Sequence, residues 1–303
     1  MDPSFKGKYD TIRGGGLGFY EMDRGLIAVW GKESVQFLDG LISNDVKTLA
    51  DGAEMLAAFP NAQGRLLAVV RVKREGERFL IETEGATREK VFQNLFRFTF
   101  AGDFFVEDLS ERYRFHAFFG GVAGIPASVA NVVYDPELLA GHFIPNEELD
   151  EYRKSLSAIG AVAIDADLYE VLRIESGILK YGIDVDESTI VPELGLAGLI
   201  SYAKGCYIGQ EIIARIHFRG HVAKSLTGLV IEADESDQSA VVSGLELTDG
   251  DGRNAGRITS VTFSPNLESV IAIAVVRYDH LAPGTRVNAG QYSAVVSPLP
   301  FLM

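Results

Sequence analysis

The chain has 303 residues, of which 47% are hydrophobic and 23% are charged, a composition typical of a globular protein with two or three domains. Its formal net charge of −14 argues against a broad nucleic-acid footprint, because Lys and Arg drive phosphate binding, although a local basic patch stays compatible. No apolar run approaches the roughly 20 residues that span a bilayer. Residues 1–13 are polar and lack the regions of a secretory signal, so we expect a cytoplasmic protein without a membrane span.

The first part of the chain alternates strand and helix patterns. The segments typical of strands are residues 26–30, 65–73, 78–84, 104–109 and 113–119. Residues 33–42 and 87–98 carry apolar residues at helical spacing, and a second helix–strand set is expected over about 125–164. No βαβ fingerprint accompanies these elements, which favours an α+β fold over a doubly wound sheet.

The pattern changes near residue 221. Beyond it we expect only short strands, at residues 225–233, 257–263, 269–278 and 293–297, separated by turn clusters. Closely spaced short strands of this kind predict a small barrel. We therefore expect two domains, residues 1–221 and residues 222–303.

Cys206 is the only cysteine, so no intramolecular disulfide can form. One thiolate also falls short of the three or four protein ligands that a structural zinc ion or an iron–sulfur cluster takes. His217 and His221 have the spacing of some zinc ligands, but Gly220 lies between them and no Glu follows His217. We expect no metal site.

One carboxylate lies on the apolar side of a predicted helix over residues 165–177. Asp165 can cap this helix, and Leu168, Leu172 and Glu175 then share one face. A carboxylate on a buried face needs strong donors. Two interpretations stay open: Glu175 pairs with a core Arg or with backbone amides, or it lines a polar pocket and accepts N–H donors from a heterocycle.

The most distinctive segment is KGCYIGQEIIARIHFRG, residues 204–220. Lys204 lies two residues before Cys206, and glycines on both sides permit close backbone approach. A nearby ammonium lowers the pKa of a thiol and raises its reactive fraction. The alternative is that Cys206 packs in the core, as free cysteines commonly do.

Residues 204–211 (KGCYIGQE), continuing to Arg215 and residues 218–220, resemble the defining motif of the YgfZ-type folate-binding proteins. Shorter pieces follow in the family's order and extend the resemblance over nearly the whole chain: FLDGLISNDV (37–46), NAQGR (61–65), RIESG (173–177), GRITS (256–260) and PLPF (298–301). These proteins are similar in fold to the T-protein of the glycine cleavage system, a tetrahydrofolate-dependent aminomethyltransferase. The resemblance implies a discontinuous folate-binding region of the aminomethyltransferase type followed by a small C-terminal β-barrel, with folate in a central channel.

The resemblance also implies a ligand, partners and site residues. The ligand is tetrahydrofolate or a derivative, and the role is the maturation or repair of iron–sulfur enzymes, including those that thiolate tRNA, with such enzymes or assembly proteins as partners. Cys206 is implied as the functional thiol, and Asp45 of the NDV turn as the group near the reactive folate nitrogen. Glu175 is implied as a pterin ligand. The further residues expected to bind folate are Lys204, Gln210 and Arg215, of which Lys204 and Arg215 give a local positive potential suited to the glutamate tail.

Two alternative functions stay open, and no turnover can be assigned. The first is a true aminomethyltransferase or other one-carbon transferase, which would transfer an aminomethyl or methyl group with tetrahydrofolate. The second is a folate-free scaffold that binds a partner through the KGCYIGQE surface. T-protein relatives lack the cysteine motif, which favours the iron–sulfur role.

Overall fold

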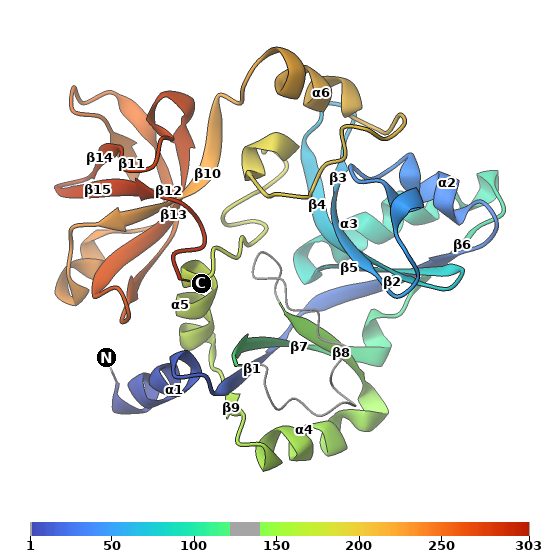
Figure 1. The fold of residues 1–303 in the computed structure, drawn as a ribbon, viewed down its shortest axis with the longest axis horizontal. Helices are drawn as coiled ribbons and strands as arrows, with labels where there is room; N and C mark the ends of the chain where they lie inside the picture. The colour runs from blue at the N-terminus through green and yellow to red at the C-terminus, as the bar shows by residue number, and fades with distance from the viewer. Residues whose placement is uncertain (1, 122–139, 303) are drawn as a thin grey trace.

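The computed structural model describes residues 2–121 and 140–302. The strands form three groups: a five-stranded sheet, a four-stranded sheet and a closed barrel. Figure 1 shows them as three lobes, with the barrel on the left, the five-stranded sheet on the right and the four-stranded sheet below. Among the described residues, no helix is long and apolar enough to cross a membrane.

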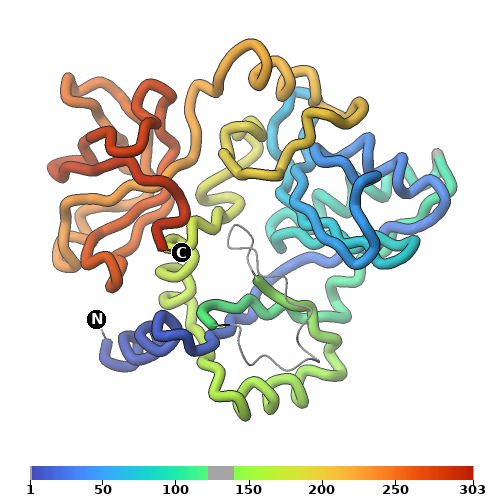
Figure 2. Tube along the Cα trace, in the orientation of Figure 1, coloured from blue at the N-terminus to red at the C-terminus, as the bar shows by residue number. Residues whose placement is uncertain are grey.

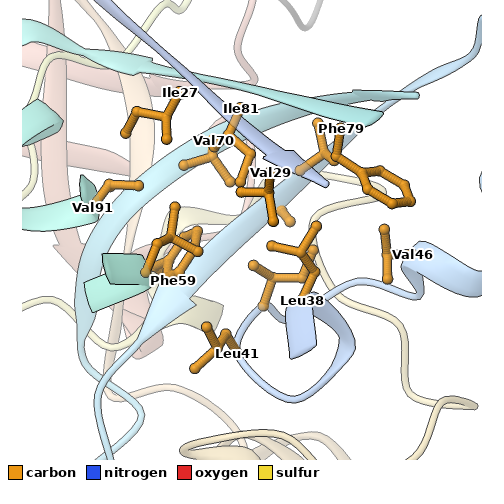
Figure 3. Close-up of a cluster of buried hydrophobic side chains, with 14 of the residues drawn as sticks. Ile27, Val29, Leu38, Leu41, Val46, Phe59, Val70, Phe79, Ile81 and Val91 are labelled. Atoms are coloured by element: carbon orange, nitrogen blue, oxygen red, sulfur yellow. The ribbon is translucent and has the colours of Figure 1, made fainter. Parts of the chain in front are cut away.

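The five-stranded sheet is antiparallel, in the order β3-β4-β5-β2-β6. Its strands are β2 (Arg24–Trp30), β3 (Glu54–Pro60), β4 (Leu66–Glu75), β5 (Arg78–Glu84) and β6 (Phe105–Asp108), and its helices are α2 (Ser34–Asp39) and α3 (Gly85–Phe96). In Figure 3, Val29, Val70 and Ile81 point into a core that also holds Leu38 of α2 and Val91 of α3. Burying each of these side chains contributes about 1.5–3 kcal/mol.

The opposite face of this sheet carries charged side chains, because successive residues of a strand alternate between the two faces. Val70 and Ile81 pack in the core, so their neighbours Arg71 and Glu82 point to the other side. Glu54 of β3 lies on that side as well. This charged face is turned toward the four-stranded sheet.

The four-stranded sheet has the order β8-β7-β1-β9, and only β9 runs parallel to its neighbour. Its strands are β1 (Leu17–Met22), β7 (Tyr113–Gly120), β8 (Gly141–Pro145) and β9 (Val162–Ala163). The helices α1 (Pro3–Arg13) and α4 (Leu149–Ala158) pack on it through Tyr9 and Ile12 and through Tyr152 and Leu156, respectively.

The C-terminal barrel closes because β10 pairs with both β13 and β15. Its strands are β10 (Lys224–Ile231), β11 (Glu246–Thr248), β12 (Asn254–Ser264), β13 (Ser269–Arg277), β14 (Arg286–Ala289) and β15 (Tyr292–Ser297). Helices α5 (Ala166–Glu175) and α6 (Gln210–Arg219) precede it. The predicted α+β fold with a small C-terminal β-barrel is confirmed. The predicted division at residue 221 falls between the end of α6 and the start of β10.

Most predicted strands are present, but some helices differ. The helix expected over 33–42 ends at Asp39. The residues that follow form a turn, in which the carbonyl of Ile42 accepts a hydrogen bond from the side chain of Lys204. Of the set expected over about 125–164, residues 125–139 lie outside the described residues, and the remainder forms β8, α4 and β9. The sequence analysis missed α1, β1, β3 and α6, and in the barrel it missed the short strands β11 and β14.

Candidate functional site

The KGCYIGQE loop is anchored by Lys204, whose ammonium is fully buried. Its Nζ donates to the backbone carbonyls of Asp39 (2.8 Å), Ile42 (2.9 Å) and Asn44 (2.7 Å) and lies 3.2 Å from Oδ1 of Asp39. Two of these carbonyls lie at or just beyond the end of α2, where carbonyls lack partners within the helix. Burial lowers the pKa of Lys204, and the carboxylate of Asp39 opposes this shift. These contacts argue against the expected role of Lys204 in holding folate, since its donors are engaged within the protein.

Cys206 is free and exposed, and Gly205 before it is exposed as well. Lys204 and Tyr207 are both buried, with Nζ of Lys204 5.1 Å from the centre of the Tyr207 ring. The amide of Ile208 then donates to the carbonyl of Gly40 (3.1 Å). The interpretation of Cys206 as a packing residue is therefore wrong: the loop is fixed on both sides of the thiol, which faces outward.

The turn that carries Asp45 lies against this loop. Asn44 donates from Nδ2 to the carbonyls of Leu56 (2.8 Å) and Gly198 (2.7 Å), and its own carbonyl accepts from Lys204. Asp45 is half-buried, and its Oδ1 accepts from the amide of Lys47 (3.1 Å). The structure thus brings together two segments that the sequence analysis singled out separately.

Gln210 and Arg215 lie on α6, which begins after Gly209. Gly209 has φ +80°, and a Cβ there would lie 2.3 Å from the carbonyl oxygen of Asn61, so glycine is required. Gln210 is half-buried at the start of the helix, and Arg215 is exposed. Glu211 lies one helical turn before Arg215 on α6, but among the described residues no ion pair joins the two.

Two cavities lie near the centre of the molecule. The outer cavity, about 280 Å³, lies between the charged face of the five-stranded sheet and strands β7 and β8. The inner cavity, about 90 Å³, is bounded mainly by apolar side chains from β3, β4 and the segment after α5, and Arg71 lines both cavities. Among the described residues that line them, none of the six site residues expected from the sequence is found.

A row of alternating charges runs along the sheet between the cavities. Arg24 contacts Oε1 of Glu82 through Nε (3.1 Å) and Nη2 (2.9 Å), and Nε of Arg71 lies 3.3 Å from Oε2 of Glu82. Nη1 of Arg71 is 3.8 Å from Oε2 of Glu54. Burial raises the pKa of Glu54, although Arg71 and Lys73 oppose the shift. The sequence analysis missed this row. Its only signal was that Arg71 and Glu82 alternate with apolar residues inside predicted strands, since Arg24 and Glu54 lie outside those strands.

Glu175 is fully buried at the junction of three elements. Its Oε1 accepts from Tyr9 of α1 (2.7 Å) and from the hydroxyl of Ser264 of β12, and its Oε2 accepts from Arg13 of α1. Burial, with the Glu175 carboxylate, raises the pKa of Tyr9 to about 12. Figure 2 shows the N-terminal helix in blue, α5 in yellow-green and the barrel in orange to red meeting in this region. This geometry argues against the expected role of Glu175 as a pterin ligand and favours pairing inside the protein, although the partner, Arg13, is 25% exposed and is not the core Arg of that alternative.

Comparison with known proteins defines the class of protein. Residues 224–302 match the glycine cleavage T-protein C-terminal barrel domain. The crystal structure of glycine cleavage system aminomethyltransferase T from Bartonella henselae matches with a TM-score of 0.84 at 20% identity, covering 98% of this chain and 89% of that chain. The fold is therefore that of the T-protein.

Two curated relatives point to different activities. The iron-sulfur cluster assembly factor IBA57 homolog, mitochondrial, of Mycosarcoma maydis is 28% identical over 229 residues, covering 68% of this chain and 55% of that protein's length. The aminomethyltransferase of Rubrobacter xylanophilus is 26% identical over 298 residues, covering 89% of this chain and 78% of its own length. The chain is thus a T-protein-like protein with sequence similarity to an iron–sulfur assembly factor. Among the described residues, no group of His, Cys, Asp and Glu is arranged to hold a metal ion.

Proposed function

We propose that the protein binds tetrahydrofolate or a derivative in the two central cavities and supports the maturation or repair of iron–sulfur enzymes through the Cys206 thiol. The observation that carries the proposal is the exposed Cys206 on a loop held by the buried Lys204. A thiol presented in this way can reach a partner protein without unfolding of the loop.

The single cysteine limits what the thiol can do. One thiolate provides too few ligands to hold a cluster by itself, so the partner or an exogenous thiol supplies the rest. The partners we expect are iron–sulfur enzymes or their assembly proteins in the cytoplasm, including enzymes that thiolate tRNA. The name of the Mycosarcoma maydis relative, an iron-sulfur cluster assembly factor, supports the link to iron–sulfur assembly.

Folate as the ligand is supported by the aminomethyltransferase relatives and by the fold. These relatives also favour a second candidate function, one-carbon transfer, because one of them covers 89% of the chain. The geometry gives that candidate less support, since Asp45, the expected catalytic carboxylate, is not among the described residues that line the two cavities.

The test is a calorimetric titration with tetrahydrofolate and its 5-formyl derivative, followed by an assay for transfer of an aminomethyl or methyl group. Saturable binding without turnover is the result that the proposal predicts. Binding with turnover would establish the transferase instead. A protein that neither binds folate nor transfers a one-carbon group would contradict both and favour the folate-free scaffold.

A further inference from the structure

Helix α6 presents an exposed aromatic ring beside two arginines. Phe218 is 67% exposed, whereas Phe side chains are usually among the most buried. Arg215 and Phe218 are three residues apart and share the helix face opposite the buried Ile213, and Arg219 follows Phe218. Figure 1 shows α6 at the top edge of the molecule, between the barrel and the five-stranded sheet. Among the described residues that line the two central cavities, none belongs to α6.

The rings next to Phe218 hold one another in place. Tyr202 and His217 stack with their ring centroids 3.6 Å apart, and Phe218 meets them edge-on at 6.1 and 4.7 Å, respectively. Such contacts restrict the side chains before any partner binds. A ring that is already ordered loses little conformational entropy on association, and aromatic residues and Arg are enriched at protein interfaces. Phe218 is therefore suited to anchor a partner.

The two arginines form a local positive site in a protein whose formal net charge is −14. They are four residues apart, so they are neighbours on the helix surface and repel each other. Among the described residues, neither has an ion pair, a side-chain hydrogen bond or a ring contact. The helix dipole favours a cation at Arg219, in the last turn, but not at Arg215. Glu211, one turn before Arg215, offsets one of the two charges, and an anionic partner would complement the remaining charge.

This part of α6 is close to Cys206. Tyr202 precedes Cys206 by four residues, and four residues span at most about 14 Å. The stacking of Tyr202 on His217 therefore keeps the end of α6 near the thiol. An interface of ordinary size, about 800 Å² on each partner, covers both. A protein bound to α6 would thus hold its own cluster ligands within reach of Cys206.

Two observations favour a protein over a nucleic acid as the partner. Single-stranded nucleic acids bind by stacking bases on open ring faces along a basic groove. Tyr202 and His217 cover one ring face of each other, which leaves fewer faces for bases. The net charge of −14 also repels a phosphate backbone that extends beyond the two arginines. An acidic protein segment needs only the local charge.

We propose that the partner protein on which Cys206 acts docks on the aromatic and basic residues at this end of α6. This α6 surface consists of Tyr202, Arg215, His217, Phe218 and Arg219. The partner, an iron–sulfur enzyme or assembly protein, contributes an acidic segment that pairs with the arginines and an apolar recess that receives the Phe218 ring. The proposal rests on the proposed function. Charge complementarity steers the encounter and fixes the orientation in which the partner meets the thiol.

The test measures rescue of iron–sulfur enzyme activity in a deletion strain of the native host, with each variant expressed at graded levels. The variants are Phe218→Ser and the double variant Arg215→Glu/Arg219→Glu. The control is Lys154→Glu, which reverses an exposed charge on α4. We expect each α6 variant to need about 10-fold more protein than wild type for half-maximal rescue, because weakened docking is overcome by mass action. Lys154→Glu should match wild type, and Cys206→Ser should fail at every level.

Measurements on the purified proteins separate docking from the other roles of these residues. Iodoacetamide should alkylate Cys206 in Phe218→Ser at the wild-type rate, which shows that the thiol is intact. The tetrahydrofolate affinity and the melting temperature of both α6 variants should match wild type. Purified tRNA of the host should bind neither wild type nor the double variant. If one α6 variant does not fold, the other decides.

Four results would overturn the proposal. Rescue by both α6 variants at the wild-type level, while Cys206→Ser fails, would remove the α6 surface and leave the proposed function standing. Weaker tetrahydrofolate binding by the double variant would assign the arginines to that ligand. Binding of tRNA by wild type but not by the double variant would make RNA the occupant. Full rescue by Cys206→Ser would contradict the proposed function and the docking site together.

Discussion

Replacing Lys204 by Met tests whether this residue holds the cysteine loop. Met keeps the length of the side chain and removes the ammonium, leaving the carbonyls of Asp39, Ile42 and Asn44 without their donor. Hydrogen bonds from a charged group are worth about 1.5–3 kcal/mol each, but Met also removes the cost of burying the ammonium. We expect a net loss of about 3–5 kcal/mol in the free energy of unfolding, as for other buried pairs that lose one partner.

Urea unfolding measures the loss, and hydrogen exchange locates it. The amides of Ser201 and Ile208 donate to the carbonyls of Ser43 (3.0 Å) and Gly40 (3.1 Å), so they should lose protection first. The control is Lys47→Met, since Lys47 also contacts Asp39 but is half-exposed, and its loss should be much smaller. A loss below about 1 kcal/mol for Lys204→Met, with protection of both amides intact, would refute the anchoring role.

Two further predictions concern buried groups. Glu175→Gln should lower the free energy of unfolding by about 3–5 kcal/mol, because it leaves Arg13 without its anion, and it should leave the affinity for tetrahydrofolate unchanged. The control is Asp167→Asn, at an exposed position on the same helix. A Glu175→Gln variant that is as stable as wild type but binds tetrahydrofolate more weakly would contradict the structural role. Burial, partly opposed by Glu21, lowers the pKa of His116 from 6.5 to about 4. The unfolded chain therefore binds a proton that the folded chain excludes, and stability should fall by about 3 kcal/mol between pH 6.5 and pH 4. His116→Phe should flatten the plot of the free energy of unfolding against pH between pH 4 and pH 6.5. An unchanged slope in this range would show that other groups cause the loss of stability.

The sequence predicted most of the longer strands and the barrel, because alternating and continuous apolar runs report directly on which face of a strand is buried. It also predicted a buried carboxylate at Glu175, since helical spacing determines the face on which a residue lies. The partners of that carboxylate could not be predicted, because Tyr9 and Ser264 lie far away in the chain and come close only when α1 and the barrel pack on α5.

The same limit applies to Lys204 and Glu54. Lys204 is close to Cys206 in the chain, but its side chain points to the turn after α2, a direction that depends on tertiary packing. Glu54 falls in a strand that the sequence analysis missed, and the charged residues on neighbouring strands resemble a solvent-exposed face. Only the packing of β7 and β8 against that face makes it the wall of a cavity.

The most direct test of the central claim is the rescue of iron–sulfur enzyme activity by Cys206→Ser in a deletion strain of the native host. This substitution changes little volume at an exposed position, so the melting temperature should stay within a few degrees of wild type. Wild type and the control Ser239→Ala, an exposed hydroxyl in the barrel, should restore the activity of several iron–sulfur enzymes. We predict that Cys206→Ser, present at the same level, restores none of it. Full rescue by Cys206→Ser would contradict the assignment of Cys206 as the functional thiol.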